Sequence, residues 1–539
     1  MSRVRRRSTT RIALVGGVAL ASLIQVGCSD SRASDGSSDD STTTEKSAVA
    51  ANPNADLSVD LSGAKVAQTV SDRFQSYNLE MASVVGGTFW APRDDPSGEA
   101  MSVHPPVELD EKLTNLTKKL GPSYLRVSGS WANKVYFDDT GRATEAPDGF
   151  QPVLTGERWS EIGRFADETG NRMVTSFAVG AGTRAPDGSW TPDLARRFLS
   201  YTVENKVPVD AAEFINEPNI QGTAGATYDA AGFARDFATL KALRDEVDPK
   251  LELLGPGGMV VGYEVMKPLD DPTTEELLET SADLFDAFSF HSYTGMSDRC
   301  STLPQVPVDR LMDRSVLGVM VENIRMSTEL RDRFMPGKKI WLTETATAAC
   351  GGDQTASKFE GAFAYLEHLG DAARNGVWVH MYNTLVASDY GIIDDRTHMP
   401  RPSYFTAYLW KKNMGTKALD VTPSAPGGGE VTDKVSAYGH CKRDTKTGAV
   451  AMAITNRDAA KAYTVDLGSK KAAAVTMTAD SLESDSALFN GKPLDISDSA
   501  TFKDPAPRTV DGTALELAPR SITFVTLPAA KAKACTTKP

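Results

Sequence analysis

Histidine and cysteine are scarce in this chain, with six and five residues among 539. No group of His, Cys and Asp has the spacing of a metal-binding motif, so we predict no bound metal and no cofactor. The glycine-rich stretch Gly255-Pro256-Gly257-Gly258 lacks the Lys and Ser/Thr of a phosphate-binding loop. The sequence therefore argues against a nucleotide site.

Basic residues are outnumbered by acidic ones. The chain has 58 Lys and Arg against 71 Asp and Glu, which gives a formal net charge of -13. It has no run of five or more basic residues outside its N-terminus. Because nucleic acids and anionic membranes attract positive surfaces, we predict no nucleic-acid partner and no membrane binding through the protein's own surface.

The first 28 residues have the features of an export signal. Arginines from Arg3 to Arg11 precede an apolar stretch, Ile12–Val26, that is short for a membrane span. Small residues lead into Cys28, which resembles the lipid-attachment site of a bacterial lipoprotein. We predict a signal peptide over residues 1–28 with lipidation of Cys28, and simple secretion is the alternative. Residues 29–55, rich in Ser, Asp and Thr, would form a disordered tether at the cell surface.

Between residues 73 and 412, strand-like runs alternate with amphipathic, helix-like stretches. Eight such units predict a (β/α)8 TIM barrel in the α/β class. A doubly wound sheet is the alternative, but it would not place functional groups at the ends of so many strands. The expected strands are Tyr77–Val85, Tyr124–Ser128, Met173–Val179, Ala212–Ile215, Leu251–Leu254, Ala287–His291, Ile340–Thr343 and Val377–Leu385.

Residues 413–539 differ from the barrel region. They contain short alternating runs, such as Val450–Thr455 and Ser521–Leu527, without helical signals. This pattern is typical of a β-sandwich domain. The apolar residues at 57, 59 and 61 also alternate, so we predict that residues 56–72 contribute a strand to this C-terminal sandwich.

Four cysteines remain once Cys28 is assigned to a lipid. An even number in an exported chain suggests disulfides. Cys300 and Cys350 follow strands that would be neighbours in the barrel, so we pair them. The bond Cys441–Cys535 would then close the C-terminal domain. The alternative is that some of these residues are free buried thiols.

Two apolar runs end in a glutamate. They are Phe214-Ile215-Asn216-Glu217 and Ile340-Trp341-Leu342-Thr343-Glu344. Barrel enzymes hold their catalytic groups at the C-terminal ends of the strands. Two carboxylates that face one sugar ring are the requirement of glycoside hydrolysis. We therefore predict a glycosidase with Glu217 and Glu344 as its catalytic pair.

Each glutamate needs a different environment. A proton donor at Glu217 needs a pKa raised toward neutrality, whereas a nucleophile at Glu344 must stay ionised. Asn216 can bind the sugar's 2-hydroxyl. The sixth strand ends near His291 and Tyr293, and an imidazole or hydroxyl from there can orient the nucleophile. The sequence leaves the distance between the two carboxylates open.

Several stretches together are similar to glycoside hydrolase family 79, which holds heparanases, plant heparanase-like proteins and bacterial β-glucuronidases. The resemblance runs from about Leu57 to the end of the barrel and, more weakly, through the C-terminal domain. The matching stretches are Tyr124–Ser130, Phe214–Asn219, Leu254–Gly258, His291–Tyr293, Trp341–Thr345, Asn383–Leu385, Asp389–Gly391, Pro402–Tyr404 and Met414–Thr416.

This resemblance implies a retaining mechanism, with Glu217 as acid/base and Glu344 as nucleophile. It implies that Tyr390 and the backbone amides of a loop containing Gly351 bind the uronate carboxylate. Further predicted sugar-binding residues are Glu80, Gly129, Ser130, Asn216 and Tyr293, together with His291 on the sixth strand.

The chain departs from the family in three places. After the nucleophile strand it has Ala348-Ala349-Cys350-Gly351-Gly352, where heparanases have a tyrosine and then glycines. Ser128-Gly129 replaces a pair of glycines, and no second basic cluster for sulfated chains is evident. The last departure and the net charge favour an exo-acting β-glucuronidase.

We therefore expect a monomeric enzyme that releases terminal β-linked glucuronic acid from a glycan or glycoconjugate. It would contact the membrane only through its N-terminal lipid. One alternative is a heparanase-like endo-β-glucuronidase acting on a uronate-containing polysaccharide. The other is a non-catalytic carbohydrate-binding lipoprotein of the cell surface.

Overall fold

The computed structural model describes residues 54–536, except for 221, 223–227, 261–271, 301–304, 427–428, 430, 446 and 470. The predicted signal peptide, Cys28 and almost all of the predicted tether therefore lie outside the described residues. None of the described helices combines the length and the hydropathy that a bilayer-spanning segment requires.

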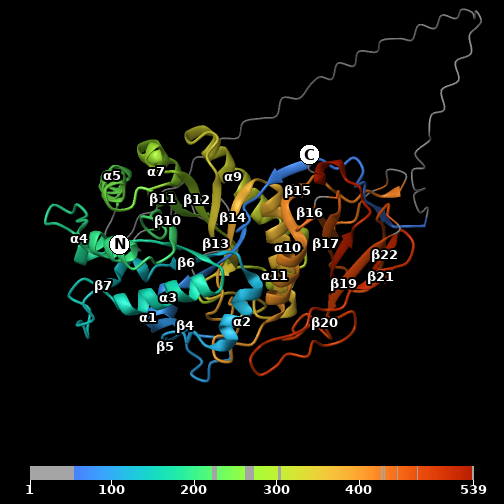
Figure 1. Ribbon diagram of the computed structural model, residues 1–539, viewed down its shortest axis with the longest axis horizontal. Coiled ribbons are helices and arrows are strands. Elements are labelled where there is room, and N and C mark those ends of the chain that lie inside the picture. Colours follow the sequence, from blue (N-terminus) through green and yellow to red (C-terminus); the bar gives the residue numbers. More distant parts are fainter. Residues whose placement is uncertain are drawn as a thin grey trace, which may run out of the picture. The chain divides into compact units, whose positions relative to one another are not determined.

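Eight parallel strands close into a barrel, which confirms the predicted (β/α)8 fold (Figure 1). Each strand pairs with the next one along the chain, and the last pairs with the first. The barrel strands are β3 (Gln75–Glu80), β6 (Tyr124–Ser128), β9 (Arg172–Thr175), β10 (Val209–Glu213), β11 (Glu252–Val260), β12 (Ala287–Met296), β13 (Ile340–Ala349) and β14 (Val377–Tyr382).

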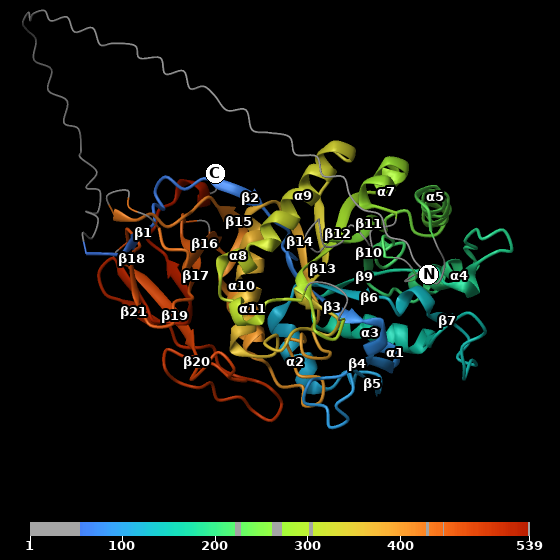
Figure 2. The ribbon, with the colours of Figure 1, turned by 180° about the vertical axis from the view of Figure 1, so that it is seen from behind.

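Helices surround this barrel in both views (Figures 1 and 2). In α2, Leu113, Leu116 and Leu120 are buried at helical spacing, and the Asp110 side chain caps the helix by accepting from the backbone N–H of Leu113. The helices are α2 (Glu111–Leu120), α3 (Gly156–Glu168), α4 (Asp193–Glu204), α5 (Ala230–Val247), α7 (Thr274–Ser281), α8 (Arg314–Leu317), α9 (Val319–Phe334), α10 (Phe359–Arg374) and α11 (Pro402–Asn413). Short 3-10 turns occur at Ala132–Lys134, Ala181–Thr183, Ala282–Leu284, Val308–Arg310 and Lys533–Cys535.

The expected first strand was too long. Residues Met81–Val85 form the short helix α1, with Met81, Ala82 and Val84 buried. An apolar run alone does not distinguish a strand from a buried helix, and the second half of this run is helical. After it comes a hairpin of β4 (Gly87–Trp90) and β5 (Met101–His104), and a second small sheet pairs β7 (Tyr136–Asp138) with β8 (Val153–Thr155).

The barrel interior is apolar at one level and charged at the next. Tyr124 on β6 packs against Trp341 on β13, with ring centroids 5.1 Å apart across the barrel. Because side chains two residues apart share one face of a strand, Arg126 also points inward, one layer further along β6. Arg126 is only 1% exposed, so the apolar layer supports a buried charge.

The C-terminal region forms two sheets around a second hydrophobic core that includes Leu57, Val465 and Leu515. The N-terminal segment supplies a strand to each sheet: β1 pairs with β18, and β2 pairs with β15. The larger sheet contains β2 (Val66–Thr69), β15 (Met414–Leu419), β16 (Val435–Lys442), β17 (Val450–Asn456), β23 (Ser521–Leu527), β19 (Ala472–Thr478), β20 (Leu488–Phe489) and β21 (Arg508–Val510). The smaller contains β1 (Leu57–Ser58), β18 (Tyr463–Asp466) and β22 (Ala514–Leu517).

A buried polar cluster joins the barrel to these sheets. The Glu367 carboxylate on α10 accepts hydrogen bonds from Tyr438 on β16 at 2.8 Å and from Thr455 on β17 at 2.6 Å. It also accepts from Arg314 at 2.9 Å. The side chain of Glu367 is fully buried, so this cluster is a structural contact rather than a surface ion pair.

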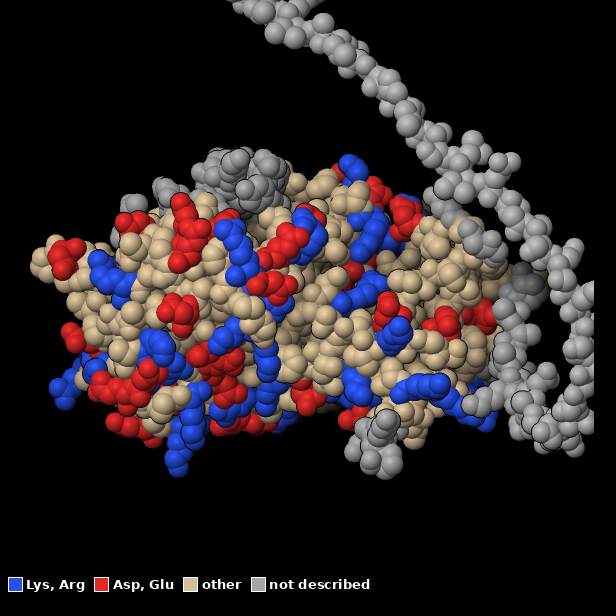
Figure 3. Space-filling model, turned by 90° about the horizontal axis from the view of Figure 1, so that it is seen from above, with Lys and Arg blue, Asp and Glu red and all other residues tan. Residues whose placement is uncertain are grey.

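Both expected disulfides are present, Cys300–Cys350 and Cys441–Cys535. The first joins the segment after β12 to the segment after β13. The second ties β16 to the C-terminal turn. On the face shown in Figure 3, basic and acidic side chains are interspersed.

Candidate active site

Glu217 and Glu344 lie at the C-terminal end of the barrel. Glu217 follows β10 by four residues and has a φ of +57°, a conformation that non-glycine residues rarely adopt. Glu344 lies within β13 and is buried. Both line a cavity of about 240 Å³, so two strands far apart in the sequence present their carboxyl groups to one space.

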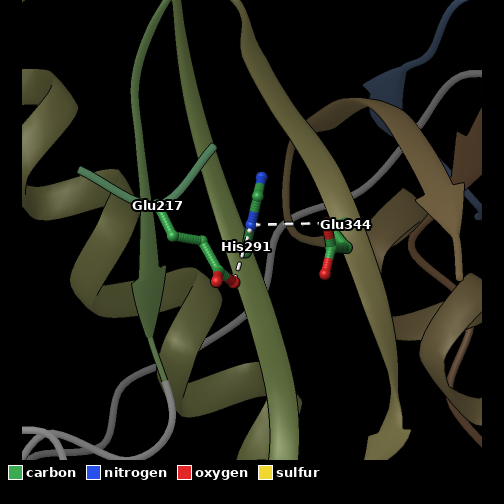
Figure 4. Close-up of side chains that lie close together, drawn as sticks. All are labelled: Glu217, His291 and Glu344. Atoms are coloured by element: carbon green, nitrogen blue, oxygen red, sulfur yellow. Dashed lines mark hydrogen bonds and ion pairs between the residues drawn. The ribbon is translucent and has the colours of Figure 1, made fainter. Parts of the chain in front are cut away.

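The two carboxylates are close together. The imidazole of His291 lies between them, with Nδ1 3.1 Å from Glu217 Oε1 and 3.7 Å from Glu344 Oε2 (Figure 4). One oxygen of Glu217 and one of Glu344 lie within 4.8 Å of each other. Inverting glycosidases separate the carboxyl groups by roughly 6.5–9.5 Å and retaining ones by roughly 5–5.5 Å. The short separation fits the second geometry.

Arg126 connects the charged groups beneath this cavity. Its guanidinium donates to Glu213 at 3.0 Å, to Glu344 at 2.9 Å and to Asn216 at 2.8 Å. Burial favours the neutral carboxyl form of Glu213, but the positive charge of Arg126 outweighs it and holds the pKa of Glu213 well below its usual range. Arg126 thus fixes the positions of its partners and the charge of Glu213.

Glu344 also accepts hydrogen bonds from its other side. The Tyr293 hydroxyl donates to Glu344 Oε1. Asn383 donates to the Tyr293 oxygen at 3.1 Å and to Glu344 Oε1 at 3.5 Å. All these groups donate to the Glu344 oxygens and hold the carboxylate in one orientation, as the attack of a nucleophile requires.

Glu217 is in the opposite environment. Burial raises its pKa, the negative charge of Glu344 raises it further, and the hydrogen bond from His291 opposes both. A raised pKa is the property that a proton donor to a leaving group requires. The environment of Glu217 therefore suits an acid, whereas Glu344 is surrounded by hydrogen-bond donors.

His291 donates to Glu217 rather than orienting Glu344. Its Nε2 lies 3.1 Å from Nη2 of Arg126 and 3.8 Å from Glu213 Oε2, so Nε2 accepts from Arg126 in the neutral ring and faces the Glu213 carboxylate in the charged ring. Burial lowers the pKa of His291, but Glu344 and the other carboxylates raise it to about 9. In either protonation state Nδ1 carries a hydrogen toward Glu217, although only the neutral ring can accept from Arg126.

Glu80, at the end of β3, is a third carboxyl group in the cavity. Burial and then the charges of Glu344 and Glu217 raise its pKa to about 8. Gly129 makes room for it, because a Cβ at Gly129 would lie 2.0 Å from Glu80 Oε2. A protonated Glu80 can both donate to and accept from a sugar hydroxyl.

Asn216 is held from three directions. It accepts from Arg126, its side-chain nitrogen donates to Ser130 Oγ at 3.4 Å, and its backbone exchanges hydrogen bonds of 3.0 Å with the Asn133 side chain. These contacts hold the segment that carries Glu217 against the loop after β6.

The loop after β13 has an unusual backbone. Cys350, Gly351 and Gly352 all have positive φ, at +60°, +83° and +92°. A disulfide joins Cys350 to Cys300. This stretch is the one in which the resemblance to heparanases predicts a tyrosine. Among the described residues, the backbone N–H groups of Gly351 and Gly352 have no acceptor. Tyr390 packs beside Gly352 and lines the cavity.

Glu217, His291 and Glu344 are also close enough to be considered as a metal site. The hydrogen bonds argue against that use. His291 Nδ1 carries the proton, and Arg126 already places a positive charge against Glu344. The cluster is better described as an acid, a carboxylate and the imidazole that separates them.

The structure brings nearly all of the predicted site residues together. Those lining the cavity are Glu80, Gly129, Ser130, Asn216, Glu217, Tyr293, Glu344 and Tyr390. His291 lies directly behind the wall, and Gly351 follows the lining residue Cys350. The residues that sequence reasoning did not assign are Arg126, Glu213, Asn383, Asn133, Trp90 and Trp131. A charge inside an apolar strand was the available signal for Arg126.

The sequence of this chain is similar to one protein family and to several known proteins. Residues 107–370 match the model of the N-terminal domain of glycosyl hydrolase family 79. Heparanase-like protein 1 of Arabidopsis thaliana is 28% identical over 356 residues, which is 61% of each chain. Inactive heparanase-2 of Homo sapiens is 26% identical over 404 residues, 71% of this chain and 66% of that protein. The chain thus matches just under two thirds of the length of these two relatives.

Solved structures share the fold. A GH51 arabinofuranosidase from Xanthomonas axonopodis pv. citri is similar with a TM-score of 0.59 and 16% identity, over 87% of this chain and all of that one. A 4-O-alpha-L-rhamnosyl-beta-D-glucuronidase from Fusarium oxysporum 12S has a TM-score of 0.60 and 16% identity over the same shares. At such identity the likeness establishes the architecture and leaves the substrate open.

Proposed function

We propose that this chain is a glycoside hydrolase of family 79 that releases terminal β-linked glucuronic acid with retention of configuration. The observation that carries the proposal is the short separation of the Glu217 and Glu344 carboxylates, within 4.8 Å. A gap of this size suits direct attack on the anomeric carbon better than attack by an intervening water. The family match over residues 107–370, which includes both glutamates, supports the same assignment.

In the proposed reaction, Glu344 attacks the anomeric carbon while Glu217 protonates the departing glycosidic oxygen. Arg126 donates to Oε2 and Tyr293 to Oε1 of Glu344, so the carboxylate is held in place for this attack. Glu217 then removes a proton from water, which hydrolyses the glycosyl–Glu344 ester and restores both groups. Asn216, fixed by Arg126, is placed to bind the 2-hydroxyl.

The loop at Gly351 and Gly352 supports the choice of a uronate. Buried backbone N–H groups without an acceptor are costly, and a carboxylate oxygen would satisfy them. In the described residues these two N–H groups lack an acceptor next to a cavity wall. Tyr390, beside them, would supply a hydroxyl to the same carboxylate.

The size of the cavity supports exo action. Its volume of about 240 Å³ is below the roughly 300–1,000 Å³ of pockets for drug-sized ligands, which favours one terminal sugar over several. An endo-β-glucuronidase would need a longer cleft. Oligosaccharides that carry both a terminal and an internal glucuronic acid test this proposal. Exo action releases only free glucuronic acid from the terminus, whereas cleavage into shorter oligosaccharides would favour the endo alternative.

The non-catalytic alternative has a specific observation behind it, because one of the relatives is an inactive heparanase-2. A panel of 4-nitrophenyl β-glycosides separates the readings, with the glucuronide, glucoside, galactoside and xyloside each offered to residues 50–539. Hydrolysis of the glucuronide alone supports the proposal. Hydrolysis of only a neutral glycoside would keep the glutamate pair and refute the uronate assignment. Glucuronide binding without turnover would favour a carbohydrate-binding protein.

The cellular location is a separate proposal. We propose export and anchoring through lipid on Cys28, and the sequence of residues 1–55 is its support. In the full chain, a C28S variant should appear in the culture medium while the unaltered protein stays with the membrane fraction. Equal release of both would favour simple secretion.

A further inference from the structure

The described lining of the cavity offers an anionic sugar no positively charged side chain. Three carboxyl groups line it, those of Glu80, Glu217 and Glu344, and its described lining residues include no lysine or arginine. Arg126 lies beneath the cavity, where it forms ion pairs with Glu213 and Glu344. A uronate carboxylate bound here therefore needs positive charge from another part of the wall.

Arg299 lies behind the loop that would hold that carboxylate. Its Nη1 is 2.6 Å from the point that a Cβ on Gly351 would occupy, so the guanidinium packs directly against the Gly351 backbone. Only a residue without a side chain leaves the guanidinium this close to the loop. The Arg299 side chain is 8% exposed, so water screens its charge little.

Two neighbours fix the guanidinium in place. Arg299 Nη2 donates to Asp389 Oδ2 at 2.6 Å, and Nη1 donates to Ser388 Oγ at 3.3 Å. Ser388 in turn donates to the carbonyl of Gly351 at 3.1 Å. Arg299 is thus tied to the Gly351 loop and to the segment that leads into Tyr390, the two elements of the proposed carboxylate site.

The covalent structure reinforces this arrangement. Arg299 precedes Cys300, whose disulfide partner Cys350 lines the cavity and precedes Gly351. Asp389 is shared with Arg93, whose backbone N–H donates to it at 3.1 Å. Asp389 thus faces two arginines, Arg93 Nε at 3.7 Å and Arg299 Nη2 at 2.6 Å, so its single negative charge does not offset both.

We propose that Arg299 is a specificity-determining residue, which acts through the Gly351 backbone to favour a carboxylate over a neutral hydroxymethyl group on the bound sugar. The proposal rests on the proposed function. It predicts that the preference for a uronate depends on the positive charge at this position, in addition to the loop amides and Tyr390.

The test measures kcat and KM of the wild type and of R299Q and R299K with 4-nitrophenyl β-glucuronide and β-glucoside. R299Q should lower the ratio of kcat/KM for glucuronide over glucoside by at least about tenfold, mainly through KM. R299K keeps the charge but cannot contact Ser388 and Asp389 as the guanidinium does, so its ratio should lie between those of the wild type and R299Q. R196Q, which breaks an exposed Arg–Glu pair remote from the cavity, is the matched control.

The outcomes separate the two proposals. If the wild type does not hydrolyse the glucuronide, both the proposed function and this inference are refuted. A wild type that prefers the glucuronide, with an unchanged ratio in R299Q or an equal loss on both substrates, refutes the inference alone. Thermal unfolding shows whether the variants fold. If R299Q does not fold, R299K decides, and a ratio lowered about tenfold although the charge is retained overturns the proposal.

Discussion

The Arg126 cluster gives a quantitative prediction about stability. Replacing Arg126 with Met removes the strongest counter-charge of the Glu213 carboxylate, whose side chain is completely buried, and leaves it only His291 at 3.8 Å. Glu213 will then take up a proton on folding rather than remain a buried, unpaired charge. The part of the stability cost that comes from Glu213 has a limit, because it cannot exceed the free energy of protonating a glutamate at the working pH.

That limit depends on pH in a defined direction. With an unfolded pKa of about 4.3, protonation costs about 3.7 kcal/mol at pH 7 and about 1 kcal/mol at pH 5. In the wild type the pKa of Glu213 is depressed, so its contribution is present above the unfolded pKa and is lost only as the pH falls through its lower folded value. The destabilisation by R126M should therefore be about 2.6 kcal/mol larger at pH 7 than at pH 5.

Thermal unfolding at the two pH values measures this difference. For a barrel of roughly 340 residues, the unfolding entropy is about 0.7 kcal/mol per degree, so Tm should fall by about 5 °C at pH 7 and by about 1.5 °C at pH 5. The control R172M breaks a partly exposed pair with Asp210 on the same barrel and should cost at most about 1 kcal/mol at either pH. Equal drops for R126M at both pH values would refute the reasoning.

Three further predictions concern catalysis and domain contact. Y293F removes the hydroxyl that donates to Glu344 and should lower kcat on the preferred glycoside about 10- to 100-fold with little change in Tm; an effect under twofold would contradict the assigned contact. Because burial raises the pKa of Glu217 and the acid must be protonated, kcat/KM should fall as pH rises through that pKa, and E217Q should lose this limb of the profile. E367Q removes the buried charge shared by α10 and Tyr438 and should destabilise the protein by about 3 kcal/mol in denaturant unfolding, whereas a wild-type midpoint would mean that the cluster is dispensable.

The proposed catalytic glutamates could be singled out from sequence because each follows a recognisable apolar run. The run predicts a strand that ends at the barrel mouth, although β10 ends at Glu213, before Phe214, and Glu344 lies within β13. The short separation of Glu217 and Glu344 could not be found this way. It depends on the left-handed conformation of Glu217 and on His291 from a third strand.

Arg126 and Arg299 show more clearly which contacts could not be predicted from the sequence. A charged residue inside the apolar strand around Arg126 signals a buried partner, but the partners lie 87 and 218 residues away on other strands. Nothing local to Arg299 indicates that Asp389, 90 residues further on, and Gly351 will surround it. Such contacts are set by barrel closure and loop packing, which residue patterns do not encode.

The most direct test of the central claim is to trap the glycosyl–enzyme intermediate. The protein is incubated with a 2-deoxy-2-fluoro-β-glucuronosyl fluoride, digested and mapped by mass spectrometry, with E344Q as the matched control. The account predicts one fluoroglucuronosyl adduct on the peptide that carries Glu344, and none on E344Q. An adduct on another residue, or no adduct on an enzyme that hydrolyses glucuronides, would contradict the proposed retaining mechanism through Glu344.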